Sequence, residues 1–405
     1  MRKLFLFCCL SLSISSVFLE ANSQREGLVY LNTIRERAGL ITLKSNSVLQ
    51  KAAASHAKYL IRHQNSGHYE KHGKEFYTGN TPSQRIVKAG YPSTFVMENI
   101  SVNTPGDAEA VDNLFSAIYH RFVFLNLDKD EIGIGSASSG KKRSIKSAYV
   151  YNLSSSYISE LCQRSFTMTN GVYYMKNICR QSSKMVPMSL FTEQKNDIER
   201  KNGDIILYPY PDQTNIWPAF YNEAPDPLPD YKVSGFPVSV QFNPVYYQSV
   251  RLKSFRLYDE IGNEIKEVRV LHFNNDPNHL LTELEFALMP LKRLEFGRRY
   301  SAVFEAVADG ERIHQRWSFS TVKPEEPLYR ITEKTTTLSV GSGTTAILYF
   351  VPNSKEDIVH SYRARGSLKV SFLDQNTLKL TFPKRDSSGR IGLDVGQKKV
   401  FFDIR

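Results

Sequence analysis

Apolar residues recur at helical spacing early in the chain and at strand spacing in much of the rest. Leu28, Leu31 and Ile34 are three residues apart and Gly39 follows where a helix would end, so we expect a helix here. A second helix is predicted by one face at i, i+3, i+4 and i+7 spacing, made of Leu49, Ala52, Ala53, His56 and Leu60. The opening part of the chain is therefore expected to be largely helical.

Two further helices and two strands are predicted before residue 155. Residues 81–84, Thr-Pro-Ser-Gln, form a capping box with proline at the first helical position, which predicts a short helix over 82–89. A longer helix is predicted to begin near Asp107 and to carry one apolar face, made of Val111, Leu114, Phe115, Ile118 and Phe122. Alternating residues predict strands at 132–136 and 147–153.

The rest of the chain is expected to be β-rich, which makes the fold class α+β and multidomain. Polar segments and a proline- and tyrosine-rich run indicate a disulfide-pinned connector over 155–230. Short alternating segments separated by turn residues predict an antiparallel sandwich of immunoglobulin-like kind over 231–322 and a second, small β domain over 323–405. Aromatic runs at 208–210 and 217–221 either stack on sugars or pack the connector against its neighbours, and the second interpretation is favoured.

The first 23 residues have the pattern of a secretory signal peptide. A basic start, Met1-Arg2-Lys3, precedes an apolar run over 4–19 and a small-residue cleavage site. The run is shorter than the roughly 20 apolar residues that span a bilayer, although a short membrane anchor is the alternative, and no later stretch approaches that length. We therefore expect the leader 1–23 to be removed and the mature protein to be soluble and extracytoplasmic, either periplasmic or secreted.

Cysteine usage and charge add to this picture. Cys8 and Cys9 lie in the leader, so Cys162 and Cys179 are the thiols left in an oxidising compartment. A disulfide between them is the simplest expectation, with two buried free thiols as the alternative. The net charge of +11 either serves solubility or attracts anionic envelope polymers, phospholipid head groups or lipopolysaccharide. No nucleic-acid-binding module is recognisable in the sequence.

Histidines are the main candidates for chemistry, because the sequence contains no phosphate-binding glycine loop, nucleophile elbow or zinc-protease helix motif. Five of the nine histidines lie between residues 56 and 120, with Glu98 among them. These are His56, His63, His68, His72 and His120. His56 is expected to be a core histidine with a buried hydrogen bond, because it lies on an apolar helix face, whereas His63 and His72 are expected to be solvated.

The order of motifs over residues 26–154 resembles the bacterial branch of the CAP superfamily, the cysteine-rich secretory, antigen 5 and pathogenesis-related proteins. Glu98-Asn99-Ile100 and His120-Arg121 are the most telling pieces. The other positions that carry the resemblance are Tyr30-Leu31-Asn32, Arg35, Gly39, Leu49, Ala52-Ala53, His56-Ala57, His68-Tyr69-Glu70, Tyr77-Thr78-Gly79, Pro82, Arg85, Ala89-Gly90-Tyr91, Tyr119 and Ile132-Gly133-Ile134-Gly135.

The resemblance implies an α-β-α sandwich with a central cleft lined by two histidines and acidic residues. Carried over by position, the cleft residues are His68, Glu98 and His120, and the metal ligands are His68 and His120. Imidazole nitrogen and carboxylate oxygen both suit a divalent metal such as zinc. Many family members carry a further glutamate before the second histidine, where the nearest acid here is Asp112. Because eight residues extend roughly 12 Å along an unbroken helix, Asp112 and His120 can share a ligand only if that helix ends between them.

Three functions remain open from the sequence. The favoured one is a non-enzymatic binding module for a divalent metal or a small apolar or lipid ligand at the cell envelope. The alternative is a metal-dependent hydrolase of peptide or cell-wall material, in which His68 and His120 hold a metal-bound water and Glu98 is the general base. The third is adhesion through the β modules. No catalytic residue is assigned, and the sequence does not identify the ligand.

Overall fold

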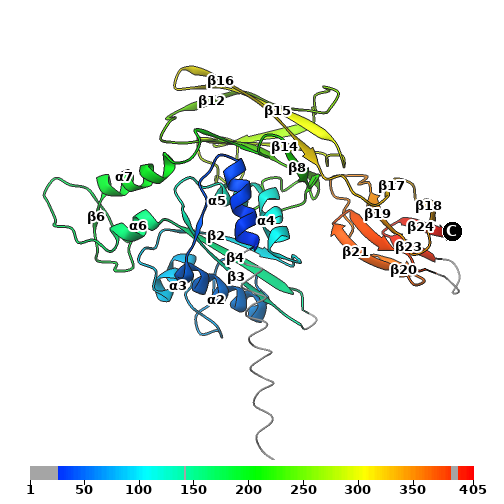
Figure 1. Cartoon of the computed structure of the whole chain (residues 1–405), viewed down its shortest axis with the longest axis horizontal. Helices are drawn as coiled ribbons and strands as arrows, with labels where there is room; N and C mark the ends of the chain where they lie inside the picture. The colour runs from blue at the N-terminus through cyan, green and yellow to red at the C-terminus, as the bar shows by residue number, and fades with distance from the viewer. Residues whose placement is uncertain (1–25, 141–142, 385–390) are drawn as a thin grey trace, which may run out of the picture.

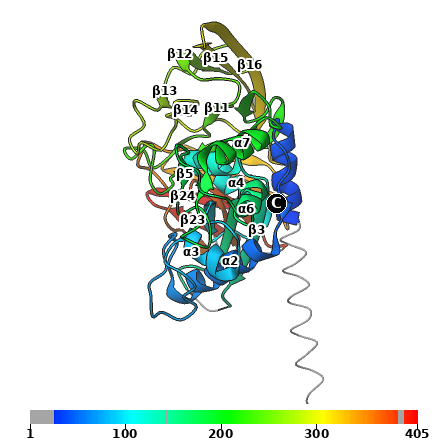
Figure 2. The same cartoon turned by 90° about the vertical axis from the view of Figure 1, so that its left-hand side faces the viewer.

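A computed structural model describes residues 26–140, 143–384 and 391–405. The predicted leader over 1–23 lies outside these described residues. Figure 1 shows a layered α/β body below a large β-sandwich, with a smaller β-sandwich beside them at the C-terminal end. Figure 2 shows the same stacking from the side, with the helical layer at one end and the large sandwich at the other. Within the described ranges, no helix has both the length and the apolar content of a membrane span.

The α/β body is built on one four-stranded sheet with helices on both faces. Its strand order is β1 (Lys44–Ser45), β3 (Glu131–Ser138), β4 (Ser147–Ser154) and β2 (Val96–Val102). The helices are α2 (Ser47–His63), α3 (Pro82–Ala89), α4 (Asp107–Ser116) and α5 (Ile118–Phe124), and residues 26–37 are also helical. α2 and α3 cover one face, and α4, α5 and the 26–37 helix cover the other, which gives three layers (Figure 1).

Close packing of α2 on β3 depends on two glycines. A Cβ atom at Gly133 would lie 2.0 Å from the backbone of Leu49, and one at Gly135 would lie 2.1 Å from the backbone of Ala54. Both distances are far below van der Waals contact, so the helix can approach the sheet only where the strand has no side chain. The alternation of glycine with Ile132 and Ile134 thus places one bare face of β3 under α2.

The long helix predicted from Asp107 to Phe122 is wrong in one respect, because it is interrupted. α4 ends at Ser116, Ala117 is extended with φ −88° and ψ 117°, and α5 begins at Ile118. The buried side chain of Arg121 accounts for part of the break. Its Nε donates to the carbonyl oxygen of Phe115 at 2.7 Å, and in a continuous helix that carbonyl would accept from a backbone N–H group instead.

β2 is a strand that the sequence pattern did not predict. Its residues Glu98, Asn99 and Ser101 are polar yet buried, so the strand lacks the apolar alternation that normally identifies one. These side chains face polar groups on the two neighbouring helical layers instead of an apolar core. Register with β4 pairs Glu98 with Asn152 and Asn99 with Tyr151, which puts Glu98 and Asn99 on opposite faces of the sheet.

The disulfide between Cys162 and Cys179 is present, with an S–S distance of 2.03 Å. It pins the segment that follows the α/β body, and the backbone N–H of Thr94 donates to the carbonyl of Ile178 at 2.9 Å, which ties this segment to the chain just before β2. Elements of this segment are α6 (Ser156–Leu161), β5 (Tyr174–Met175), β6 (Val186–Pro187) and α7 (Met188–Glu199).

The large sandwich begins earlier in the chain than residue 231. Its sheets contain β7 (Ile205–Tyr208) and β8 (Gln213–Ile216), which lie inside the segment predicted as a connector. Each is only four residues long and pairs with a strand distant in sequence, so local pattern carries little signal for it. β9 (Ala219–Phe220) pairs with β10 (Ser234–Gly235) beside the sandwich.

The two sheets of the large sandwich enclose an aromatic core. The first sheet has the order β13 (Val268–His272), β14 (Glu285–Pro290), β11 (Val238–Phe242) and β7. The second has the order β12 (Val250–Tyr258), β15 (Arg299–Ala308), β16 (Glu311–Thr321) and β8. Phe242, Phe286, Phe304, Phe255 and Trp317 make ring contacts between and within the sheets. Pairing is antiparallel except for β8, which is parallel to β16.

The C-terminal sandwich also has two four-stranded sheets. One has the order β17 (Leu328–Ile331), β19 (Thr345–Phe350), β22 (Thr377–Thr381) and β21 (Lys369–Asp374). The other has the order β18 (Thr335–Val340), β24 (Lys398–Ile404), β23 (Ile391–Val395) and β20 (Arg363–Arg365). Each sheet includes one parallel pair, β17 with β19 and β18 with β24, which departs from the purely antiparallel pairing expected.

A buried ion pair joins the two sandwiches. Arg293 lies 2.8 Å from Asp374, and both side chains are almost fully buried. Trp217 and Tyr221 donate to the same aspartate at 3.1 and 2.6 Å. The 217–221 aromatic run therefore packs modules against each other, as the favoured interpretation held, through hydrogen bonds as well as ring contacts.

Candidate functional site

A network of ionisable side chains lies between the sheet of the α/β body and the α2/α3 layer. Its members are His56, His68, Glu70, Arg85 and Glu98. Four of the five side chains are buried, and His68 alone is partly open to solvent, with its side chain 38% exposed. The network thus presents one imidazole at the surface and keeps its formal charges inside.

Arg85 and Glu98 form the centre of the network. The Nη2 atom of Arg85 donates to both carboxylate oxygens of Glu98 at 2.7 Å, and Nη1 donates to the carbonyl oxygen of His68 at 2.8 Å. The position of Arg85 follows from the local sequence, because Thr81 caps α3 and so places Arg85 one turn into the helix, facing β2. A buried charge needs such a partner, since burying either one alone is costly.

The pKa of the Glu98 carboxyl is lowered by this arrangement. Burial raises it, but the hydrogen bond with His68 and the charge of Arg85 lower it by more, with further contributions from His56. The side-chain amide of Asn152, opposite Glu98 in the sheet, donates to its Oε2 at 3.0 Å. Glu98 is therefore held as a carboxylate with its lone pairs directed at protein donors.

His56 and Glu70 form a second buried pair. His56 Nδ1 lies 2.8 Å from Glu70 Oε1, and both residues are fully buried. The carboxylate of Glu70 also accepts from the backbone N–H of Thr78 at 2.6 Å. Burial raises the pKa of Glu70, but the hydrogen bonds from His56 and Thr78 lower it by more. His56 is thus the core histidine with a buried hydrogen bond that its position on α2 predicted.

His68 is held by the network at one ring nitrogen. Its Nδ1 lies 3.0 Å from Glu98 Oε1, and among the described residues its Nε2 makes no hydrogen bond. A carboxylate that accepts from one ring N–H fixes the tautomer and orientation of an imidazole, and it leaves the other nitrogen as a lone-pair acceptor. The geometry can therefore present the Nε2 atom to a bound molecule.

His120 lies on the other side of β2. The amide of Asn99 donates to the carbonyl oxygen of His120 at 2.8 Å, and Asn99 faces away from Glu98. The ring of His120 turns to a different partner, because its Nδ1 lies 2.8 Å from Glu223 Oε2. The structure thus brings His68 and Glu98 together, but it does not bring His120 to them.

The two histidines predicted as metal ligands therefore do not share a site. In the part of the chain that the structure describes, no group of three or more His, Cys, Asp or Glu side chains could hold a metal ion. The break at Ala117 does separate Asp112 from His120, but Asp112 accepts from the hydroxyl of Tyr30 at 2.6 Å and is not a ligand partner.

The three residues Tyr119, His120 and Arg121 instead contact the large sandwich. The Tyr119 hydroxyl donates to Asp276, and Arg121 Nη1 donates to Ser239 Oγ at 3.1 Å. The guanidinium of Arg121 also lies 4.8 Å from the ring centre of Tyr208, and burial lowers its pKa to about 10. Glu223 accepts from the backbone N–H groups of Tyr119 and His120, which caps α5 from the neighbouring module.

Comparison with known families agrees with this layered fold. The sequence model of the cysteine-rich secretory protein family, CAP, matches residues 28–153. These residues form a CAP domain. The match ends one residue before the end of β4, so the sandwich modules lie outside it. A search among curated proteins finds no match.

Similar solved structures include two bacterial proteins. An outer surface protein from Borrelia burgdorferi is 19% identical over 33% of this chain and 92% of that chain, with a TM-score of 0.29. An extracellular protein containing an SCP domain from Bacillus anthracis is 20% identical over 34% of this chain and 41% of that chain, also with a TM-score of 0.29. This chain therefore spans less than half of the Bacillus anthracis protein.

Three residues that contact His68, Glu98 or His120, or the network around them, were not assigned a role from sequence. Arg85 and Glu70 stand among the positions that carry the family resemblance, and that resemblance is the signal that could have marked them. Glu223 lies in the segment predicted as a connector, and no local pattern marks it as the partner of His120. His63 and His72 lie outside the network. The Nε2 atom of the half-buried His63 lies 2.8 Å from the carbonyl oxygen of Glu75, and His72 is exposed.

Proposed function

We propose that the mature protein is an extracytoplasmic, non-enzymatic binding protein, made of a CAP domain over residues 26–154 and two β modules. The leader pattern over 1–23 and the match to a secretory protein family support the location. We interpret the two β-sandwiches as immunoglobulin-like modules, with the first starting at β7 and the second at residue 323. The first module contacts the CAP domain at α5 through Glu223.

The engagement of Glu98 by Arg85 is the observation that carries the proposal. A general base needs a lone pair free to take a proton and a pKa near the working pH. Both oxygens of Glu98 instead accept from Arg85 at 2.7 Å, and its pKa is lowered. Glu98 is therefore suited to orient His68 and poorly suited to activate a water molecule.

The position of His120 also favours binding over metal-dependent hydrolysis. The hydrolase hypothesis requires His68 and His120 on one metal ion, with a bound water between them and the substrate. His120 is paired with Glu223 and contacts Asn99 from the face of β2 opposite Glu98. A metal held by His68 alone would need its other ligands from outside the site.

We propose His68 as the residue through which the CAP domain contacts its ligand. The side chain is 38% exposed, and Glu98 orients it so that Nε2 is available as an acceptor. The 64–81 segment, which contains His68, also exposes Tyr69 and Phe76. These two side chains are 65% and 47% exposed and supply apolar surface. These features fit a small ligand with an apolar body and a hydrogen-bond donor, which is the apolar or lipid class of ligand.

Binding and hydrolysis can be separated in one series of variants. A dansyl-labelled fatty acid serves as the apolar probe, and a peptide mixture and soluble peptidoglycan serve as hydrolysis substrates. We expect saturable binding of the fatty acid that weakens about fivefold in His68→Ala, which loses one hydrogen bond. His72→Ala, which changes an exposed histidine outside the network, should bind like the wild type.

Two outcomes would overturn the proposal. One is product release from either substrate by the wild type that is lost in both His68→Ala and Glu98→Gln, which would make the site catalytic. The other is tight, stoichiometric zinc binding that is lost in both His68→Ala and His120→Ala, which would place the two histidines on one metal after all.

A further inference from the structure

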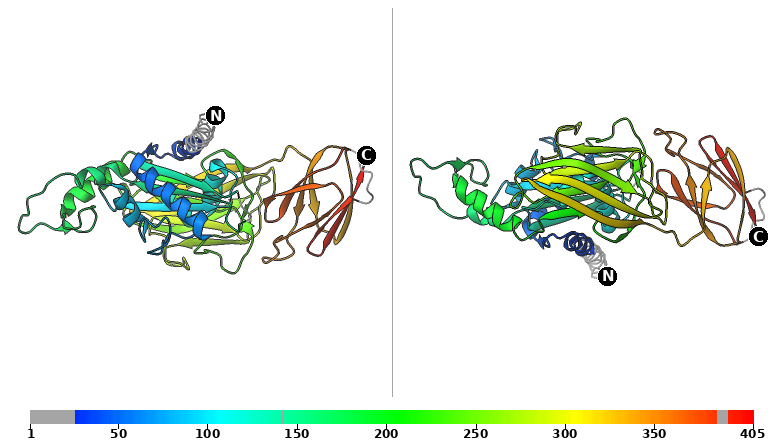
Figure 3. Two further views of the ribbon diagram at one scale, coloured as in Figure 1. Left: turned by 90° about the horizontal axis from the view of Figure 1, so that it is seen from below. Right: turned by 90° about the horizontal axis from the view of Figure 1, so that it is seen from above.

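The outer face of the large sandwich carries an unusual excess of positive charge. Strands β12, β15 and β16 form this face, and no other described element lies over it when the molecule is seen from above (Figure 3, right). Outward-facing positions on the three strands hold six arginine and lysine side chains against one glutamate, Glu305. The six basic residues are Arg251, Lys253, Arg256, Arg299, Arg312 and Arg316.

The strand register arranges four of these arginines in two similar rows. Val303 of β15 lies between Arg256 of β12 and Arg316 of β16. The second row, four residues further along β15, consists of Val307 between Arg251 and Arg312. At about 4.8 Å between strands and about 3.3 Å per residue, arginines in a row start roughly 10 Å apart and the rows lie roughly 13 Å apart. Cationic pairs with an apolar centre thus repeat along the sheet.

Most of these arginines are not committed to partners within the protein. Arg299 is paired with Asp212 at 2.5 Å. In contrast, Arg251, Arg312 and Arg316 have no ion-pair partner among the residues that the structure describes, and Arg256 bonds to the hydroxyl of Tyr258 on its own strand. An anion that binds here does not need to break an ion pair of these arginines.

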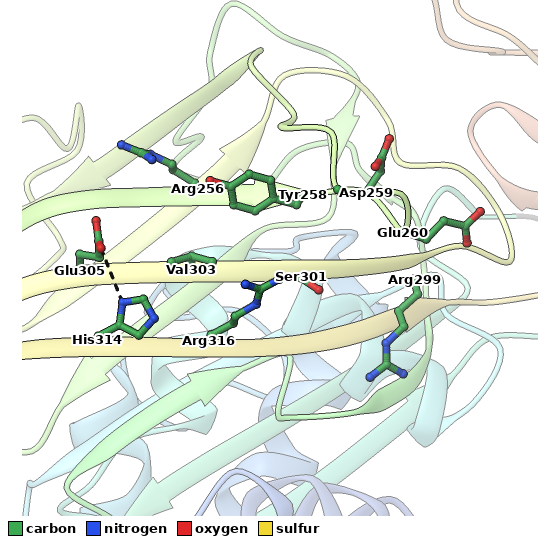
Figure 4. Close-up of a pocket in the computed structure, with 11 residues that line it drawn as sticks. Arg256, Tyr258, Asp259, Glu260, Arg299, Ser301, Val303, Glu305, His314 and Arg316 are labelled. Atoms are coloured by element: carbon green, nitrogen blue, oxygen red, sulfur yellow. Dashed lines mark ion pairs between the residues drawn. The ribbon is translucent and has the colours of Figure 1, made fainter.

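A hollow of about 590 Å³ lies on this face (Figure 4). Its lining includes Arg256 and Tyr258 of β12 and Val303 and Arg316 of the neighbouring strands. Glu305, the acidic side chain between the two rows, accepts from Ser254 Oγ at 2.6 Å and lies 3.6 Å from His314 Nδ1. The other acids of the hollow, Asp259 and Glu260, lie at one end, near the hairpin that follows β12.

We propose that this basic face binds an acidic polysaccharide. The arginines would contact its carboxylate or sulfate groups, because the guanidinium fork matches such groups in a bidentate manner. Sugar rings present apolar C–H faces, for which Val303 and the ring of Tyr258 offer contact surfaces within the hollow. Repeated cationic rows suit a linear polymer with repeated charges. This site does not involve His68, so it is independent of the CAP ligand.

The test compares two variants that each remove two positive charges from the full-length mature protein. Arg256→Gln/Arg316→Gln changes the hollow, and Arg37→Gln/Arg363→Gln changes exposed arginines on the 26–37 helix and on β20. The probes are heparin, polygalacturonate and neutral dextran, with binding measured by calorimetry at physiological salt. We expect the hollow variant to bind heparin or polygalacturonate about tenfold more weakly and the control variant to bind like the wild type, with no binding to dextran.

Further variants make the outcome decisive. Glu305→Gln should bind more tightly, because it removes the acidic charge between the rows, and His68→Ala should bind unchanged. If thermal unfolding shows that the hollow variant is unstable, the Lys253→Gln/Arg312→Gln variant is tested in its place. The same weakening of polysaccharide binding is expected for it. Equal weakening in the hollow and control variants would overturn the proposal, as would wild-type protein that binds neither polysaccharide. Binding only to single-stranded DNA or only to phosphatidylglycerol vesicles would also overturn it.

Discussion

Arg85 holds both carboxylate oxygens of Glu98 at 2.7 Å, in a site where both side chains are buried. This pair joins α3 to β2, and the additional hydrogen bond from Arg85 to the carbonyl oxygen of His68 joins the 64–81 segment to both. The surface position of His68 therefore depends on an ion pair beneath it. Its contribution to stability and to binding can be measured separately.

Replacing Arg85 by methionine should destabilise the protein strongly. The change leaves Glu98 buried without its counter-charge, and breaking a buried pair in this way costs about 3–5 kcal/mol. Urea unfolding followed by circular dichroism measures the free energy of unfolding. Lys88→Met, at an exposed position of the same helix, is the control and should cost less than about 1 kcal/mol. A similar loss in the free energy of unfolding for the two variants would show that breaking the buried pair costs no more than a substitution at an exposed position.

Stability should fall as the pH drops below the ordinary pKa range of glutamate. The pKa values of Glu98 and Glu70 are lowered in the folded protein, so the unfolded chain binds protons at a higher pH than the folded one. Their contribution is fully present above about pH 4.5 and is lost as the pH falls through the folded pKa values. Urea unfolding between pH 7 and pH 3 should show this loss, with a shallower slope in Glu98→Gln. Equal slopes for the two proteins would contradict the assignment.

His120 and Glu223 should be energetically coupled although they lie in different modules. Glu223→Ala removes the cap of α5 and the partner of His120, with an expected cost of about 1–2 kcal/mol. A double-mutant cycle with His120→Ala should give a coupling energy above about 0.5 kcal/mol. Glu193→Ala, at an exposed position of α7, is the control. Additive effects of Glu223→Ala and His120→Ala would mean that the contact does not stabilise the module interface.

Removing the disulfide should lower stability by a moderate amount. Cys162 and Cys179 are 17 residues apart, and cross-linking a loop of this size is worth about 3 kcal/mol through the entropy of the unfolded chain. Reductant should therefore lower the melting temperature of the wild type. The Cys162→Ser/Cys179→Ser variant should already melt at the lower temperature and should not respond to reductant. A melting temperature of the wild type that is insensitive to full reduction would refute this prediction.

Local sequence determined much about the CAP domain. The Thr81 cap with the following proline defines α3, and the bare glycine positions of β3 agree with the tight packing of α2. The family resemblance placed His68 and Glu98 in one site, where the structure pairs them at 3.0 Å. Elimination of the leader cysteines left one disulfide, which is present between Cys162 and Cys179. These features depend on caps, on close packing within one domain or on a motif whose members lie near one another in sequence.

Only the tertiary structure decided how the remaining residues are used. The break at Ala117 separates α4 from α5, and the ring of His120 then meets Glu223, which is 103 residues away. No periodicity in the sequence records such a contact, because hydrophobic spacing reports which face of an element is buried and not which distant element covers it. The arginine rows of the large sandwich have the same origin: Arg256 and Arg316 become neighbours of Val303 only through strand register. Sequence alone therefore defined the domain and its charged residues, and strand register and packing between modules determined which of them meet.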